Sequence, residues 1–120
     1  MRFMWALLLL AIATAAGAQE RTIAHMEGCL VWSRDGNIAA RNECSRPIAL
    51  MYMDFDVQQT VKAELAPGAR FTSDSVWGQT IGFMFTACPL GYRPSVRFGL
   101  ENKEAIGVSL YNCVAAEPTS

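Results

Sequence analysis

The sequence predicts an all-β domain: a small antiparallel β-sandwich, or partly open barrel, of about eight short strands closed by two disulfides. Three observations lead to this class. Strand-like runs recur between turn signals about every eight to twelve residues. Four cysteines follow an apolar leader, and an even count in that context indicates disulfides. No segment shows the apolar period of about 3.6 residues that marks an amphipathic helix.

Residues 1–18 are expected to be a cleaved export signal. A short positive start and an apolar run at 3–13 precede small residues at 14–18, which fit a cleavage pattern. The apolar run is shorter than the roughly 20 residues that span a bilayer, so we expect no membrane anchor after cleavage. The mature protein would then be periplasmic or secreted.

Removing residues 1–18 from the 120 leaves 102, enough for one domain with a real core. We expect an N-terminal arm at 19–27, as a loose segment or short edge strand, the β-sandwich at 28–114 and a disordered tail at 115–120. The mature part carries nine Lys and Arg against eleven Asp and Glu. This balance excludes the basic footprint of a nucleic-acid-binding protein, and we expect a monomer.

The first predicted hairpin joins strands at 28–34 and 37–42, because Asp35-Gly36 between two strand-like runs favours a type I′ turn. Residues 48–55 follow as the longest apolar β-like run outside the leader. Large side chains on both faces place this strand in the middle of a sheet or sandwich. Pro47 stands at its entry, where a missing N–H costs little.

The next predicted strand, 58–65, alternates apolar and polar residues and should have one wet face. Pro67-Gly68 fits a type II turn after it. The remaining expected elements are strands at 70–72, 80–87, 96–98 and 106–111, a loop at 73–78, a tight connection at 88–94 and a turn at 101–104. The strands with the strongest apolar patterns predict four core side chains: Leu50, Tyr52, Phe83 and Phe85.

The four cysteines, Cys29, Cys44, Cys88 and Cys113, lack the Cys-x-x-Cys spacing of zinc knuckles and thioredoxin-type redox pairs. In a meander all four fall at one end of the domain, so geometry excludes none of the three possible pairings. We expect Cys29–Cys44 and Cys88–Cys113, because each bridge closes a nearby loop. Each would stabilise the fold by about 2–4 kcal/mol.

Catalysis has little support in the sequence. His25, the one histidine, lies in the predicted arm, where we expect a solvated residue, and the cysteines are expected to be oxidised. We therefore expect no enzyme. The alternative is a small periplasmic enzyme with a dispersed acid/base site drawn from the carboxylates. These are Asp35, Asp54, Asp56, Glu64 and Asp74.

Two sets of residues raise the question of metal binding. Asp54 and Asp56 share a strand face and could offer oxygen ligands to Ca²⁺, but no further ligands stand beside them. Met51, Met53 and Met84 could offer soft sulfur to Cu(I), which makes a copper-handling protein a third alternative. We expect strand-end charge in the first set and core packing in the second, and hence no metal or cofactor.

Three residues suggest recognition. Trp77 is a large aromatic residue in a predicted polar loop. Tyr92 and Arg93 lie between two prolines beside a half-cystine, and these residue types are enriched in binding hot spots. The sequence therefore predicts a non-catalytic binder of a protein or other macromolecule, with protease inhibition through Arg93 as one form. The opposing interpretation is that Tyr92 lies back on the sandwich rim and Arg93 is solvated.

Overall fold

The computed structural model describes residues 22–116, and this part of the chain confirms the all-β class. The predicted export signal lies outside the described residues, as does most of the predicted tail. The strands are β1 (Thr22–Ala24), β2 (Leu30–Trp32), β3 (Asn37–Asn42), β4 (Ile48–Asp54), β5 (Thr60–Leu65), β6 (Arg70–Val76), β7 (Phe83–Pro89), β8 (Tyr92–Pro94) and β9 (Asn112–Ala115). The helical elements are the 3-10 turns η1 (Glu27–Cys29) and η2 (Leu100–Asn102) and the short helix α2 (Lys103–Gly107).

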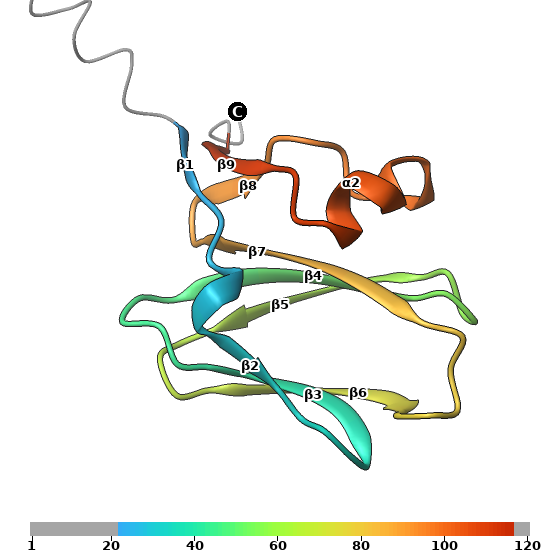
Figure 1. The fold of residues 1–120 in the computed structure, drawn as a ribbon. Coiled ribbons are helices and arrows are strands. Elements are labelled where there is room, and N and C mark those ends of the chain that lie inside the picture. Colours follow the sequence, from blue (N-terminus) through green and yellow to red (C-terminus); the bar gives the residue numbers. More distant parts are fainter. Residues whose placement is uncertain (1–21, 117–120) are drawn as a thin grey trace, which may run out of the picture.

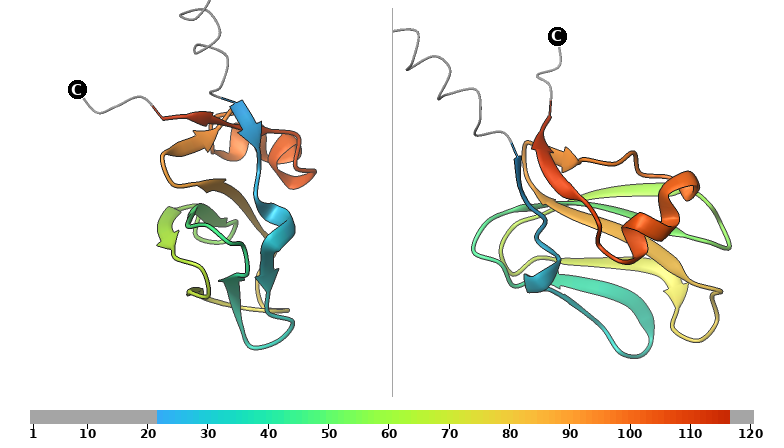
Figure 2. Two further views of the ribbon diagram at one scale, coloured as in Figure 1. Left: turned by 90° about the vertical axis from the view of Figure 1, so that its left-hand side faces the viewer. Right: turned by 45° about the horizontal axis from the view of Figure 1, so that its top comes forward.

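The strands form three antiparallel sheets of three strands each, in the orders β1-β9-β8, β2-β3-β6 and β5-β4-β7. The sheet β5-β4-β7 is the middle layer (Figure 1). The sheet β2-β3-β6 packs on one of its faces, and β1, β8, β9 and α2 cover part of the other. The end-on view in Figure 2 shows the same three layers. The prediction that β4 is a central strand is therefore confirmed, since it pairs with β5 on one side and β7 on the other.

The main core lies between the middle sheet and β2-β3-β6. Its buried members come from both sheets: Leu30, Ala40, Cys44, Ile48, Leu50, Leu65 and Ala87. Five aromatic rings extend this core, with centroids 4.6–6.2 Å apart: Trp32, Tyr52, Phe71, Phe83 and Phe85. Leu50 and Tyr52 are buried as predicted. Phe83 and Phe85 are only half-buried, because β7 is at the edge of its sheet.

The other face of the middle sheet has its own smaller cores. Met53 and Met84 face each other across β4 and β7 and pack with Ile106 of α2. Cys88 and Cys113 pack with Tyr111 where β9 approaches β7. No helix in residues 22–116 is long and apolar enough to cross a membrane.

Both predicted disulfides are present, Cys29–Cys44 and Cys88–Cys113. The first ties η1 to the connection after β3. The second ties β9 to β7. Two disulfides in so small a domain are consistent with an extracellular or otherwise oxidising compartment.

Two predicted boundaries around β6 and β7 are wrong. The segment 73–76 is not a loop, because β6 continues through Val76 with Ser73 buried and its neighbours facing outward. A polar Ser-Asp-Ser run hides this alternation in the sequence. The segment 80–82 is not yet strand, and Ile81 is 80% exposed.

The end of the chain departs most from the prediction. The segment 96–98 is not a strand, and 106–111 is not the last strand, which is β9. Ile106 is buried at the end of α2, whereas Val108 and Leu110 are 65% and 70% exposed. The alternation of apolar residues there marks no sheet face. Ser109 adopts a left-handed conformation, with φ of 59°, between the helix and β9.

Candidate binding groove

A hollow of about 600 Å³ lies between β8 and the outer face of β4 and β5. It forms because β8, β9 and α2 cover the β7 side of the middle sheet and leave the β5 side bare (Figures 1 and 2). Six of its lining side chains matter for recognition: Met51, Lys62, Glu64, Tyr92, Arg93 and Pro94. We call this hollow the binding groove.

The floor of the binding groove follows from the pairing of β4 with β5. Met51 pairs with Lys62 and Ala49 pairs with Glu64, so these four side chains share the outer face of the sheet. Lys62 and Glu64 are exposed, while Met51 is half-buried. The floor is therefore apolar on β4 and charged, with both signs, on β5.

The wall of the binding groove contains two of the three predicted binding residues. Tyr92 is half-buried and packs against the core around the Cys88–Cys113 bridge. Arg93 is exposed, and the contact that the structure gives its guanidinium is a long hydrogen bond to Pro94 O (3.5 Å). Tyr92 can thus offer a fixed aromatic surface and Arg93 a charged donor.

The predicted tight connection at 88–94 is shorter than expected, because β7 extends to Pro89 and β8 begins at Tyr92. Its turn is Leu90-Gly91, where Gly91 has a φ of 84° that suits glycine. Leu90 N–H donates to Pro47 O (3.3 Å), and Ala116 N–H donates to Gly91 O (2.8 Å). The backbone beside the groove is therefore held in place on both sides.

Trp77 lies at the other end of β4, away from the binding groove. Its Nε1 donates to Ser33 Oγ (3.0 Å), and its ring meets Phe83 edge-on at a centroid distance of 5.5 Å. The side chain is half-buried and extends the aromatic core. The structure therefore brings together Tyr92 and Arg93 but does not bring Trp77 to them.

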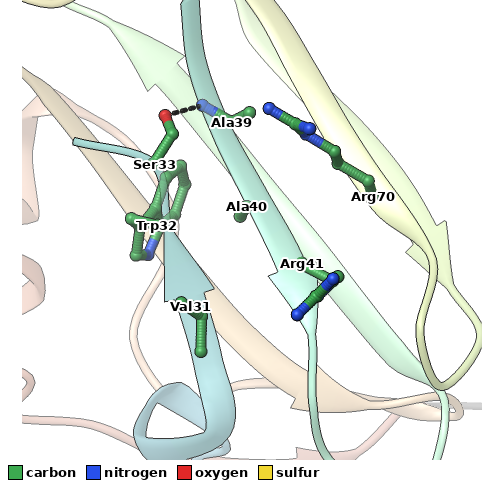
Figure 3. Close-up of a pocket in the computed structure, with 7 residues that line it drawn as sticks. All are labelled: Val31, Trp32, Ser33, Ala39, Ala40, Arg41 and Arg70. Atoms are coloured by element: carbon green, nitrogen blue, oxygen red, sulfur yellow. Dashed lines mark hydrogen bonds between the residues drawn. The ribbon is translucent and has the colours of Figure 1, made fainter. Parts of the chain in front are cut away.

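A second hollow, of about 240 Å³, lies on the sheet β2-β3-β6 (Figure 3). Val31, Arg41 and Arg70 form one cross-strand row, and Arg41 forms an ion pair with Glu43 (2.7 Å). The guanidinium groups of Arg41 and Arg70 point to opposite ends of the hollow in Figure 3. They do not converge on one position, so this row does not form a joint site for an anion.

Three of the carboxylates considered in the sequence, Asp54, Asp56 and Asp74, line a third hollow of about 220 Å³. Asp54 is buried and accepts hydrogen bonds from Ser75 Oγ, from Thr80 Oγ1 (3.0 Å) and from the Asp56 N–H (2.7 Å). Burial alone would raise the pKa of Asp54, but these hydrogen bonds outweigh it and lower the pKa below its ordinary value. Asp54 is therefore an ionised anchor between β4, β6 and the loop before β7.

The other two carboxylates considered, Asp35 and Glu64, lie elsewhere, the first in the β2–β3 hairpin and the second in the binding groove. Within residues 22–116, no group of three or more His, Cys, Asp or Glu side chains is arranged to hold a metal ion. Of the methionines considered for copper, Met53 and Met84 are buried in the core. Met51 lines the groove.

A polar cluster at the edge of β7 was not expected from the sequence. Glu27 accepts hydrogen bonds from Ser109 Oγ (2.7 Å) and from the Tyr111 hydroxyl. That hydroxyl also accepts a hydrogen bond from the Ala87 N–H (3.0 Å), and the His25 ring packs at a tilt against the Tyr111 ring, with centroids 5.0 Å apart. Burial, together with the hydrogen bond to Glu27, raises the pKa of the Tyr111 phenol well above its ordinary value. His25 is thus half-buried in a packed cluster, not a solvated tail residue.

Comparison with protein-family models, with curated proteins and with solved structures finds no match for this chain. The groove residues that sequence reasoning missed are Met51 and the charged pair Lys62 and Glu64. No linear signal joins them to Tyr92, because β5 and β8 meet only through the packing of two sheets.

Proposed function

We propose that this protein is an exported, non-catalytic β-sandwich that binds another protein through the binding groove. The observation that carries the proposal is that Tyr92 and Arg93 line one hollow, of about 600 Å³, together with Met51, Lys62 and Glu64. Both belong to β8, which a disulfide-linked strand and the Leu90-Gly91 turn hold in place. A preorganised surface loses little conformational entropy on binding.

The chemistry of the groove suits an extended segment of a protein. The apolar floor at Met51 and the ring of Tyr92 offer area to an apolar side chain. Arg93 and Lys62 can donate charge-assisted hydrogen bonds to an acidic side chain or a carbonyl. Protease inhibition has less support, because Arg93 lies within a paired strand opposite Val114 and does not project from a loop.

Export to the periplasm or the medium is part of the same proposal. The apolar leader at 1–18 supports it, and the two disulfides are compatible with it. The expected partner is therefore another exported or surface protein. We expect a free-thiol titration of the folded protein to detect no thiol, because all four cysteines form disulfides.

The test is capture of the partner from the native envelope or culture fluid, followed by measurement of its affinity. The double variant Tyr92→Ala with Arg93→Ala should weaken binding by about 2 kcal/mol, or thirtyfold, because it removes both anchors. Because Tyr92 also packs against the core around the Cys88–Cys113 bridge, the affinity is compared at a temperature well below the thermal midpoint of the variant.

A matched control removes an exposed arginine outside the groove. Arg34→Ala, in the β2–β3 hairpin, should leave the affinity unchanged. Full binding by the double variant would remove β8 from the interface. Equal weakening by the two variants would indicate a general loss of positive charge and not a specific groove.

A further inference from the structure

Two sheet edges lie open on the same side of the molecule. β5 is an edge of the middle sheet, and β6 is an edge of the sheet below it. The two strands are consecutive and joined by the short turn at 66–69, so their edges run along one side of the sandwich (Figures 1 and 2). We call this side the β5–β6 flank.

The backbone groups on the β5 edge point outward at alternate residues. Phe55 N–H donates to Gly82 O (2.9 Å), so the odd-numbered residues of β4 bond to the β7 side. Met51 is one of these, and Lys62 is its partner in the register with β5. The N–H and C=O groups of Lys62 and Glu64 therefore face away from β4 and are free to pair with another strand.

The same reasoning applies to β6. Asn42 N–H donates to Ala69 O (2.9 Å), so the odd-numbered residues of this stretch bond to β3. The backbone groups of Arg70 and Thr72 therefore face away from β3, in the regular part of β6 before its register with β3 shifts beyond Thr72. Within residues 22–116, both edges of the flank thus present donors and acceptors without a partner.

The flank carries four exposed charges: Lys62 and Glu64 on β5, and Arg70 and Asp74 on β6. On each strand the two charges have opposite sign and share the outer face, because they are an even number of residues apart. The ion pairs found within residues 22–116 lie elsewhere. Each of these four charges is therefore available to a partner.

If β5 pairs with β5 of a second copy, one antiparallel register places opposite charges across from each other. Three registers of antiparallel self-pairing through the outward groups bring charged residues of the two copies opposite each other, with centres at Lys62, Ala63 and Glu64. The first places lysine opposite lysine and the third places glutamate opposite glutamate, and like charges in direct opposition are unfavourable. Centring on Ala63 places Lys62 opposite Glu64 twice, with the small Ala63 side chains at the axis.

The charges of β6 are complementary to those of a second β6 in the same way. Centring it on Thr72 places Arg70 opposite Asp74 twice. Ala63 lies three residues before the turn at 66–69, and Thr72 lies three residues after it. A single twofold axis through the sandwich can therefore pass close to both centres, as an isologous dimer requires.

The surface between the two edges also suits a second copy. A hollow of about 190 Å³ opens there, with Tyr52, Val61 and Phe71 among its lining residues. Val61 is 42% exposed and Phe71 is half-buried. Pairing of both edges would cover these apolar side chains, which contributes to association.

From these observations we propose that the β5–β6 flank is a homodimer interface. β5 pairs antiparallel with β5 of a second copy about Ala63, and β6 pairs with β6 about Thr72. Both sheets of the sandwich then continue across the twofold axis. This departs from the monomer expected from the sequence, and it does not depend on the function proposed for the groove.

The test is the association state of the oxidised, secreted protein in sedimentation equilibrium. The wild type should be a dimer. Lys62→Glu should raise the dimer dissociation constant about tenfold or more, because two attractive pairs become repulsive. Glu64→Lys should do the same with the opposite charge. An equal mixture of the two variants should form a heterodimer, since acidic β5 then meets basic β5.

The matched control is Lys103→Glu on α2, which makes the same charge change away from the flank and should leave the dimer intact. A wild type that stays monomeric up to millimolar concentration would overturn the proposal. So would wild-type association by Lys62→Glu, or a mixture of the two variants that stays monomeric. Recovery on mixing also shows that both variants are folded.

Discussion

The two edges of the middle sheet are finished in opposite ways. At β7, Ala87 O accepts the Met26 N–H (2.9 Å), and the Ala87 N–H donates to the Tyr111 hydroxyl. Segments from both ends of the described chain thus cover that edge. At β5, no segment of residues 22–116 bonds to the outward groups of Lys62 and Glu64. The same sheet is sealed on one side and open on the other.

The difference shows that the groove, the exposed charges and the free edge all lie away from the covered side of the middle sheet. The segments that cover the middle sheet at β7 are β1, β9 and α2, which lie together above it (Figure 1), and the Cys88–Cys113 bridge ties β9 to β7. The β5 side keeps its groove, its charges and its free edge. An open edge is an aggregation risk unless charges or a partner control it, and Lys62 and Glu64 provide such charges.

The largest expected effect comes from removing the bridge that holds the sealed edge. Cys88→Ser with Cys113→Ser should lower the free energy of unfolding by about 2–4 kcal/mol, because β9 is no longer tied to β7. Urea unfolding measures the loss. Hydrogen exchange at the Ala87 amide should accelerate in the same variant. An unchanged exchange rate would show that the bridge is not needed to keep the β7 edge covered.

A smaller effect is expected from removing one hydroxyl at that edge. Tyr111→Phe leaves the buried Ala87 N–H without its acceptor and takes a donor from Glu27. Such a loss costs about 1–3 kcal/mol of unfolding free energy. The control, Tyr92→Phe on the groove side, should change stability by less than about 0.5 kcal/mol. Similar losses in both variants would contradict the assignment of the Tyr111 hydroxyl to the edge.

Acid should weaken the anchor at the end of β4. The fold lowers the pKa of Asp54, so its contribution to stability is present above the pKa of the unfolded chain, near 4. That contribution is lost as the pH falls through the lower pKa of the folded state. Asp54→Asn should cost about 1–2 kcal/mol at neutral pH. In this variant the free energy of unfolding, measured with urea, should fall less steeply as the pH is lowered. An unchanged fall would mean that another group is responsible for it.

The smallest effect on unfolding is expected at the open edge. Lys62→Glu should change the stability of the monomer by less than about 0.5 kcal/mol, because the side chain is exposed and unpaired there. In the same variant, the Glu64 amide should exchange rapidly while the Ala87 amide stays protected. Protection of both amides in the monomer would mean that another segment of the same protomer covers the edge of β5.

Much of the fold could be predicted because its signals are local. Strand β3 was predicted at its observed bounds, β4 was recognised as central, and Pro67-Gly68 marked the turn into β6. The disulfide pairing followed from the short loops that the bridges close. Alternation, turn residues and cysteine spacing can all be read along the sequence without knowing how the sheets pack.

The rest depended on how the sheets pack. Alternation at Ile106, Val108 and Leu110 suggested a strand, but Ile106 alone is buried and the segment bends at Ser109. Of the candidate groove, the sequence singled out Tyr92 and Arg93 by their residue types, and both line it, while their role in binding stays a prediction. Their charged neighbours on β5 could not, because the sequence does not say which strands are edges or which faces are left bare.

The covered edge at β7 limits how many copies of the protein can add to the middle sheet. A sheet that is open at both edges can add copies without end, whereas a sheet open at one edge takes on one copy and stops. In the proposed dimer, β7 of each copy forms the outer limit of the joined middle sheet. The bridge between Cys88 and Cys113 holds the cover on that limit. Loss of this bridge would therefore loosen the cover at the outer limit of the joined sheet.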